Sequence, residues 1–287
     1  MTKDRFGNTL TPGLPYAQGE FIRDSRDDHA KLRRAWEHIA AREKESGIGG
    51  TFNFSGLERR FEAQTEDLAL LDDELAPALM ADRLEELALD HLGGQAPEHG
   101  IMVFNRQTAA ILTATLALVE PGQTVIGVSD TGSHPCVVRG ASRARANFVD
   151  ALGLAQFEKE LASNEDVALV SLTRLAVSYE ILSVKEIDRI VMLSHDAGAK
   201  VLVDDAGGAR VGPAVFDQPK MLELGVDVGS TGLDKYGTIG PRVGLMGGRR
   251  DLVEKMRALA FELGLEARPM LYPAVVHSLE QYDPAGF

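Results

Sequence analysis

The sequence predicts an α/β fold with three layers, in which helices cover both faces of a mainly parallel sheet. From residue 101 onward, short apolar runs alternate with segments of helical periodicity. In addition, polar residues such as Asp204 and the segment 230–235 directly follow apolar runs. Alternation of this kind is typical of parallel sheets with crossover helices, which bind ligands beyond the carboxyl ends of their strands.

The predicted strands are short and apolar, and they cover residues 101–104, 124–128, 167–172, 200–204, 226–229 and 243–246. The predicted helices place apolar residues three or four positions apart, most clearly over residues 108–119, 185–197 and 250–263.

The N-terminal part of the chain has a different character. Residues 1–25 are mixed in composition and contain several glycines and prolines, so we expect an extended arm. A charged helix is predicted over residues 27–45, with Leu32, Trp36 and Ile39 on one face.

A loop with aromatic anchors is expected over residues 51–57, and helical periodicity returns over residues 72–92. These features predict three regions: an N-terminal arm and helix over 1–50, a large domain over 51–265, and the start of a truncated C-terminal region over 266–287.

Composition narrows the functional classes. The chain has 287 residues, 44% of them hydrophobic, which is ample for a large core. A net charge of −13 repels phosphate backbones and argues against nucleic acid as a main partner. Cys136 is the single cysteine, which fits a reducing cytoplasm. Residues 1–5 lead into polar sequence without an apolar core, so no secretory signal is expected there. The longest apolar stretch, 109–119, is too short to span a membrane.

Asp204 is the first residue with a chemical implication. It ends the run Lys200-Val201-Leu202-Val203, which has the character of a buried strand. A carboxylate there can pair with a protonated pyridine nitrogen, which makes the ring an electron acceptor for a substrate carbanion. Asp205 follows and points to the opposite side if the strand continues. Taken alone, an aspartate at a strand end more often caps a turn.

Lys235 lies in the segment Ser230-Thr231-Gly232-Leu233-Asp234-Lys235-Tyr236-Gly237. An isolated lysine between an acid and a tyrosine is usually a solvated surface residue. Here Ser230 and Thr231 offer hydroxyls to a phosphate, and a partly desolvated lysine beside a cationic ring has the lowered pKa that a Schiff-base nucleophile requires. A strand-end acid followed by a loop lysine therefore predicts pyridoxal 5′-phosphate (PLP) as the cofactor.

A phosphate needs hydrogen-bond donors as well. The run 101–104 leads through Asn105 into a predicted helix that begins near Gln107 and Thr108, where backbone N–H groups and side chains can bind a dianion. An ordinary capped helix is the simpler alternative. His134 follows the strand predicted over 124–128 and is either a flat side chain stacked on the cofactor ring or a turn histidine.

Two arginines are candidates for binding a substrate carboxylate. Arg242, in Gly240-Pro241-Arg242-Val243-Gly244, is the stronger candidate, and Arg174 at another strand end is the weaker one. Cys136 is expected to be a small packed residue. The remaining histidines show no ligand spacing, so no metal is predicted, and the absence of G-x-G-x-x-G after the first strand argues against a dinucleotide fold.

The lysine segment resembles that of the selenocysteine synthase-like family. The similar residues are Gly225-Val226-Asp227-Val228, Ser230, Asp234-Lys235 and Gly240-Pro241-Arg242-Val243-Gly244. That family includes bacterial L-seryl-tRNA(Sec) selenium transferase and belongs to the fold-type I, aspartate-aminotransferase-like PLP enzymes. The resemblance runs from about residue 53 to residue 270 and includes Asn53-Phe54-Ser55-Gly56-Leu57 and residues 105–110.

The resemblance implies roles for several residues. Lys235 forms the internal aldimine, Asp204 binds the ring nitrogen, and Gln107, Thr108 and Ser230 serve the phosphate. It also implies the large domain of the fold, with the C-terminal small domain absent or truncated, and at least a homodimer. The acidic charge and the lack of an evident tRNA-binding domain argue against selenium transfer itself.

These observations predict a PLP-dependent enzyme that acts on a small amino acid, by elimination or replacement at the β-carbon. Lys235 would be the base for the α-proton. The alternatives are an aminotransferase or aldolase on the same scaffold, a non-catalytic PLP-binding protein, and a nucleotide-binding α/β module.

Overall fold

The computed structural model describes residues 3, 25–54, 57–61 and 64–286 and divides the chain into two units, residues 1–55 and 56–287. The first unit contains helix α1 (Ser25–Ser46) and a 3-10 turn, η1 (Ile48–Gly50), which confirms the predicted N-terminal helix. The arm expected over residues 1–25 lies almost wholly outside the described residues.

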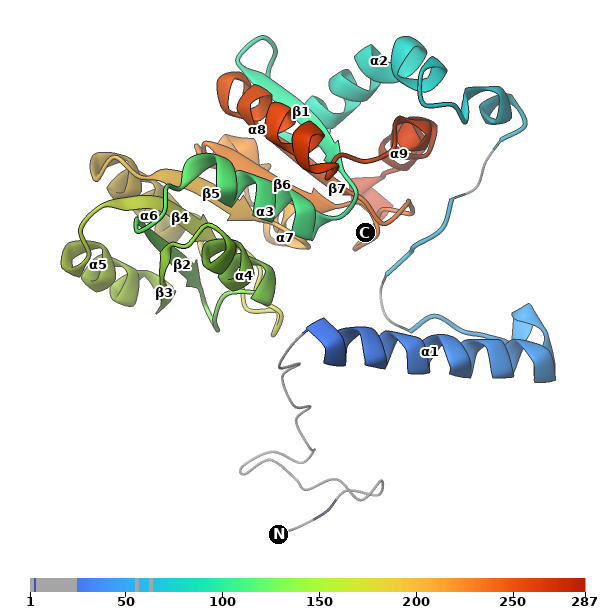
Figure 1. Ribbon diagram of the computed structural model, residues 1–287, viewed down its shortest axis with the longest axis horizontal. Helices are drawn as coiled ribbons and strands as arrows, with labels where there is room; N and C mark the ends of the chain where they lie inside the picture. Colours follow the sequence, from blue (N-terminus) through green and yellow to red (C-terminus); the bar gives the residue numbers. More distant parts are fainter. Residues whose placement is uncertain (1–2, 4–24, 55–56, 62–63, 287) are drawn as a thin grey trace. The chain divides into compact units, whose positions relative to one another are not determined.

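The second unit is built on a seven-stranded sheet of order β1-β7-β6-β5-β4-β2-β3 (Figure 1). Its strands are β1 (His99–Phe104), β2 (Thr124–Ser129), β3 (Asn147–Leu152), β4 (Val167–Leu172), β5 (Lys200–Asp204), β6 (Val228–Gly232) and β7 (Gly244–Arg249). Only β7 runs antiparallel to its neighbours, β1 and β6, and the other pairs are parallel. The predicted mainly parallel sheet is thus confirmed.

Helices cover the sheet on both faces (Figure 1). They are α2 (Leu75–Leu92), α3 (Gln107–Leu118), α4 (Pro135–Arg143), α5 (Gly153–Ser163), α6 (Val184–Asp196), α7 (Gly208–Phe216), α8 (Arg250–Leu263) and α9 (Tyr272–Glu280), with 3-10 turns η2 (Glu66–Leu70), η3 (Leu222–Leu224), η4 (Pro269–Leu271) and η5 (Pro284–Gly286). The sheet has two hydrophobic cores: α3, α4 and α8 contribute to one, and α2, α5, α6 and α9 contribute to the other. The three-layer α/β architecture is therefore confirmed.

Strand β6 differs from the prediction in a way that matters for the site. The sequence predicted a strand over residues 226–229, but the ladder with β5 begins where Leu202 pairs with Val228 and continues to Asp204 with Ser230. Asp227 precedes it and binds the Val201 N–H through its carboxylate at 2.9 Å. The strand consequently carries Ser230 and Thr231, both fully buried, into the sheet.

Strand β3 was missed by the sequence analysis because it lies at the edge of the sheet. It pairs only with β2, and Ala151 is its one buried residue, so it lacks the apolar run of a central strand.

Residues 266–287, which the sequence analysis set apart, belong to the second unit. Helix α9 packs on α2, and Val275 and Leu279 lie in the same core cluster as Leu84. None of the helices in the described part of the chain combines the length and the apolar character that a bilayer crossing requires.

Candidate functional site at the carboxyl ends of β5 and β6

Asp204 and Asp205 diverge at the end of β5. Alternation along the strand places Asp204 on the same face as Leu202, toward α3, whereas Asp205 continues to the opposite face. Both residues are buried: 4% of the surface of Asp204 is exposed, and none of that of Asp205. Asp204 therefore faces the polar groups described next, and Asp205 has a different partner.

A single amide joins Lys235 to Asp204. The Gln107 Nε2 group donates to Asp204 Oδ1 at 2.7 Å and to the Ser230 carbonyl at 3.1 Å. The Lys235 Nζ group donates to Gln107 Oε1 at 3.1 Å. Gly232 allows the chain to pass close to the Asp234 carboxylate, since a Cβ there would lie 2.9 Å from Asp234 Oδ1. The tertiary structure thus brings the predicted lysine and acid to one place.

Burial shifts the pKa values of Lys235 and Asp204 in opposite directions. Desolvation lowers the pKa of Lys235, although the nearby carboxylates of Asp234 and Asp204 oppose it. Desolvation raises the pKa of Asp204, although the charges of His134 and Lys235 oppose it. A cation held against Asp204 would favour its ionised form, and the lowered pKa of Lys235 favours the neutral amine that a nucleophile or base requires.

His134 lies beside Asp204 and caps helix α4. Its Nδ1 atom accepts the Cys136 backbone N–H at 3.2 Å, so a neutral ring carries its proton on Nε2. The Cys136 Sγ atom lies 3.0 Å from His134 Nδ1 and donates to Asp204 Oδ2 at 3.6 Å. The turn position of His134 is therefore established, and its stacking on a cofactor ring stays a prediction.

His134, Cys136 and Asp204 bring three possible metal-ligand atoms within 4.8 Å of one another. Their proximity is explained by the hydrogen bonds among them, because the imidazole and the carboxylate each accept a hydrogen bond from Cys136.

Two buried hydroxyls flank Asp204 on the neighbouring strands. Ser230 is paired with Asp204 across β5 and β6, and Thr173 follows β4 one residue beyond the pairing of Leu172 with Val203. Strand alternation places both side chains on the α3 face with Asp204. Within the described residues, Ser230 Oγ and Thr173 Oγ1 are buried without a hydrogen-bond partner. Such groups are costly unless another molecule supplies the partner.

Arg210, which was not singled out from the sequence, fixes the loop that carries Lys235. This fully buried residue of α7 donates through Nε to the carbonyls of Lys235 and Tyr236 at 3.0 and 3.1 Å. Its Nη2 group donates to the carbonyl of Gly232 at 2.7 Å. Arg210 is the single charged residue of the apolar segment Gly208–Phe216, directly after the Asp204 strand, and this position in the sequence could have indicated a buried structural role.

An ion pair supports the same loop. The buried carboxylate of Asp234 accepts from Arg59 Nε at 2.7 Å, and the Glu58 N–H donates to the Asp234 carbonyl at 3.0 Å. The segment around Leu57 thus forms a bridge beside Lys235, although it is far away in the sequence.

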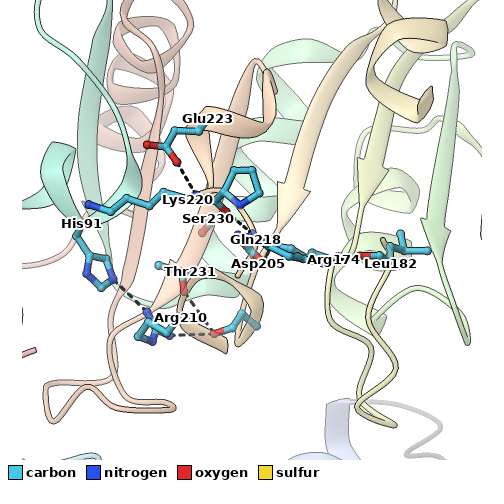
Figure 2. Close-up of polar contacts among 12 residues, drawn as sticks. His91, Arg174, Leu182, Asp205, Arg210, Gln218, Lys220, Glu223, Ser230 and Thr231 are labelled. Carbon is cyan, nitrogen blue, oxygen red and sulfur yellow. Dashed lines mark hydrogen bonds and ion pairs between the residues drawn. The ribbon is translucent and has the colours of Figure 1, made fainter. Parts of the chain in front are cut away.

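Arg174 corrects an expectation. Its side chain is completely buried and pairs with Asp205 through two hydrogen bonds, while its Nη1 group donates to the Pro219 carbonyl at 2.7 Å (Figure 2). A guanidinium with these partners and no exposed surface does not reach a substrate carboxylate. Arg174 instead balances the buried charge of Asp205 on the face away from α3.

The remaining predicted residues lie around the site. Arg242 is exposed, two residues before β7. Thr108 is exposed in the first turn of α3, where the backbone N–H groups have no intrahelical acceptor. The side-chain amide of Asn105 donates to the Gly264 carbonyl at 3.4 Å. Gln107 was expected at a phosphate, and its side chain instead bridges Lys235 and Asp204.

A cavity of about 360 Å³ lies elsewhere, at the amino ends of β2, β4 and β5, where it is lined by Gln123, Val167 and Lys200 among others. Ligands of parallel sheets bind at the opposite, carboxyl ends, where the amine and the carboxylate meet. The chemistry of the side chains therefore places the candidate site there.

Comparison with proteins of known sequence shows the family of this chain. The chain is 35% identical over 265 residues to a UPF0425 pyridoxal phosphate-dependent protein of Methanothermobacter thermautotrophicus, covering 92% of this chain and 68% of that protein. The chain belongs to the UPF0425 family of pyridoxal phosphate-dependent proteins. A family member from Methanosphaera stadtmanae is 31% identical over 83% of this chain and 60% of its own length. An arginine decarboxylase of Bacillus subtilis is 22% identical over 80% of this chain and 48% of that protein. No family model matches the chain.

Solved structures with the same fold are named as a gamma lyase and a gamma synthase. A cystathionine gamma synthase from Xanthomonas oryzae superposes with a TM-score of 0.59 and 19% identity, covering 85% of this chain and 62% of that one. A cystathione gamma lyase from Micromonospora echinospora superposes with a TM-score of 0.57 and 24% identity, covering 69% of this chain and 50% of that one. These likenesses confirm the fold-type I architecture, whereas the selenocysteine synthase-like subfamily finds no support among them.

The side chains present fit the cofactor for which the family is named. A primary amine and a carboxylate lie close enough for one amide to bridge them, and the hydroxyls of Ser230 and Thr173 are unpaired beside them. An amine suits an aldehyde, a carboxylate suits a pyridinium nitrogen, and buried hydroxyls suit polar ring substituents.

Proposed function

We propose that this chain is a PLP-dependent enzyme that acts on a small amino acid by elimination or replacement at its β-carbon. The observation that carries the proposal is the Lys235–Gln107–Asp204 arrangement, in which one side-chain amide bridges an amine and an acid. The membership of the UPF0425 family supports the choice of cofactor. The gamma-lyase and gamma-synthase names of the structural neighbours support a reaction of the elimination or replacement type.

Each residue has a defined part in this proposal. When bound, the cofactor supplies an aldehyde for an amine and a ring that accepts an electron pair. Lys235 would hold the cofactor through its Nζ atom and later take a proton from the substrate α-carbon, because desolvation favours its neutral form. Asp204 would hold the ring nitrogen as a cation. Arg210 keeps the backbone of Lys235 in place through the carbonyls that it binds.

The selectivity of the site would follow from the groups that flank it. Ser230 and Thr173 would bind ring substituents, and the first turn of α3, with Thr108, would bind the phosphate. Arg242 is the remaining candidate for the substrate carboxylate. In this proposal the protein is a selenocysteine synthase-like member that forms a homodimer in the cytoplasm. Light scattering after gel filtration tests the dimer.

Absorbance spectra test the cofactor assignment. Wild-type protein incubated with PLP should develop a visible band that Lys235→Ala lacks, and borohydride should then attach the cofactor permanently to Lys235, as located by mass spectrometry. Lys255→Ala on the exposed surface of α8 is the matched control and should behave as wild type. Equal labelling of wild type and Lys235→Ala would refute the role of Lys235.

The reaction requires a second measurement. Release of a keto acid and ammonia from a small amino acid, with no amino acceptor added, is the expected result. Strict dependence on an added acceptor would refute elimination and support transamination, and release of an aldehyde would support aldol cleavage. Bound PLP without turnover of any amino acid in a broad screen would support a non-catalytic protein, whereas nucleotide binding without a visible band would refute the PLP assignment altogether.

A further inference from the structure

The thiol of Cys136 is the second donor to the buried carboxylate of Asp204. Cys136 is the second residue of α4 and is 6% exposed. Its Sγ atom lies 3.6 Å from Asp204 Oδ2, while Gln107 Nε2 donates to Oδ1 at 2.7 Å. Both carboxylate oxygens are thus bound by neutral donors from two different helices, so the plane of the carboxylate is determined from both sides.

The surroundings of Cys136 make it a donor and not a nucleophile. Burial, together with the adjacent charge of Asp204, raises the pKa of the thiol, so it stays protonated. The Cys136 Sγ atom lies 3.0 Å from His134 Nδ1 and 3.6 Å from Asp204 Oδ2. Because the single lone pair of Nδ1 accepts the Cys136 backbone N–H, the carboxylate is the acceptor for the thiol proton. The N-terminus of α4 also favours a negative charge close to its first turn.

We propose that Cys136 is a positioning residue whose thiol holds the Asp204 carboxylate in the orientation and charge state required opposite the cofactor ring nitrogen. This inference rests on the proposed function, in which Asp204 binds that nitrogen. Hydrogen bonds to charged groups contribute more than those between neutral groups. Losing this one leaves Oδ2 buried without its donor and favours protonation of Asp204.

Three substitutions separate hydrogen bonding from packing. Cys136→Ala removes the donor and some volume, Cys136→Val fills the volume without a donor, and Cys136→Ser restores a donor of similar size. Val137→Ala is the matched control, because Val137 is the next residue of α4, is buried, and belongs to the same core cluster.

The readouts are the affinity of the cofactor-free protein for PLP, measured by calorimetry in reducing buffer, and the pH titration of the visible band of the loaded protein. In Cys136→Ala and Cys136→Val we expect PLP binding about tenfold weaker and a titration midpoint displaced by about one pH unit. Cys136→Ser should recover most of both effects, and Val137→Ala should change PLP affinity less than twofold.

The outcomes distinguish this inference from the proposed function. If Cys136→Val behaves as wild type, or if Val137→Ala and Cys136→Ala are equally affected, the role of Cys136 is packing and the inference is overturned. In that case Asp204→Asn would still weaken PLP binding, and the proposed function would stand. Failure of the wild-type protein to bind PLP would overturn both.

Discussion

His91 contacts Arg210, the residue that holds the loop carrying Lys235, and the protonation of His91 should therefore weaken the fold. The imidazole lies on α2, is buried, and has its Nε2 atom 3.4 Å from Arg210 Nη1. The same guanidinium binds the carbonyls of Gly232 and Lys235. Burial, reinforced by the charges of Arg210 and Lys220, lowers the pKa of His91 from 6.5 to about 3. A proton on His91 would place two buried cations in contact.

The magnitude follows from proton linkage. As the pH falls, the unfolded chain protonates this imidazole near pH 6.5, whereas the folded protein excludes the proton until about pH 3. The contribution of neutral His91 to stability is therefore fully present above pH 6.5 and is lost progressively below it. One pKa unit corresponds to about 1.4 kcal/mol, so acidification from pH 6.5 to pH 5 should cost about 2 kcal/mol through His91 alone.

Urea unfolding at several pH values between 7 and 5 measures this cost. His91→Gln keeps a hydrogen-bond acceptor for Arg210 but does not titrate, so its free energy of unfolding should vary less with pH than that of wild type. His38→Gln, at an exposed position of α1, is the matched control and should keep the wild-type slope. Equal slopes for wild type and His91→Gln would refute the reasoning that burial keeps His91 neutral.

Two further substitutions test the framework of the site. Gly244→Ala would place a Cβ 2.7 Å from the backbone N and Cα of Gln107, so the start of α3 must move. We expect lower stability and weaker PLP retention, measured by thermal unfolding and by the visible band, and unchanged PLP retention would contradict this close packing. Arg174→Met would leave Asp205 buried without its partner and should lower the free energy of unfolding by about 3–5 kcal/mol. Arg174→Met combined with Asp205→Leu should recover much of that loss in urea unfolding, and a loss equal to the sum of both single changes would contradict the pairing.

Several features could be read from local sequence. The central strands are continuous apolar runs, because both of their faces are buried, and the helices show a clear period. The divergence of Asp204 and Asp205 follows from strand alternation alone. The boundary of β6 and the edge strand β3 were harder to predict, since the first depends on the side-chain hydrogen bond of Asp227 and the second lacks an apolar run.

The type of fold and the chemical candidates could be predicted from the sequence, because apolar periodicity and residue type are local properties of the chain. The sequence placed Lys235 and Asp204 at strand ends, but it contained no measure of the distance between them. The packing of the chain showed that Gln107, separated by 97 residues from Asp204 and by 128 from Lys235, joins the two. The same holds for Arg210, Cys136 and the burial of Arg174, since a side chain finds its distant partner only when packed helices and strands bring their ends together.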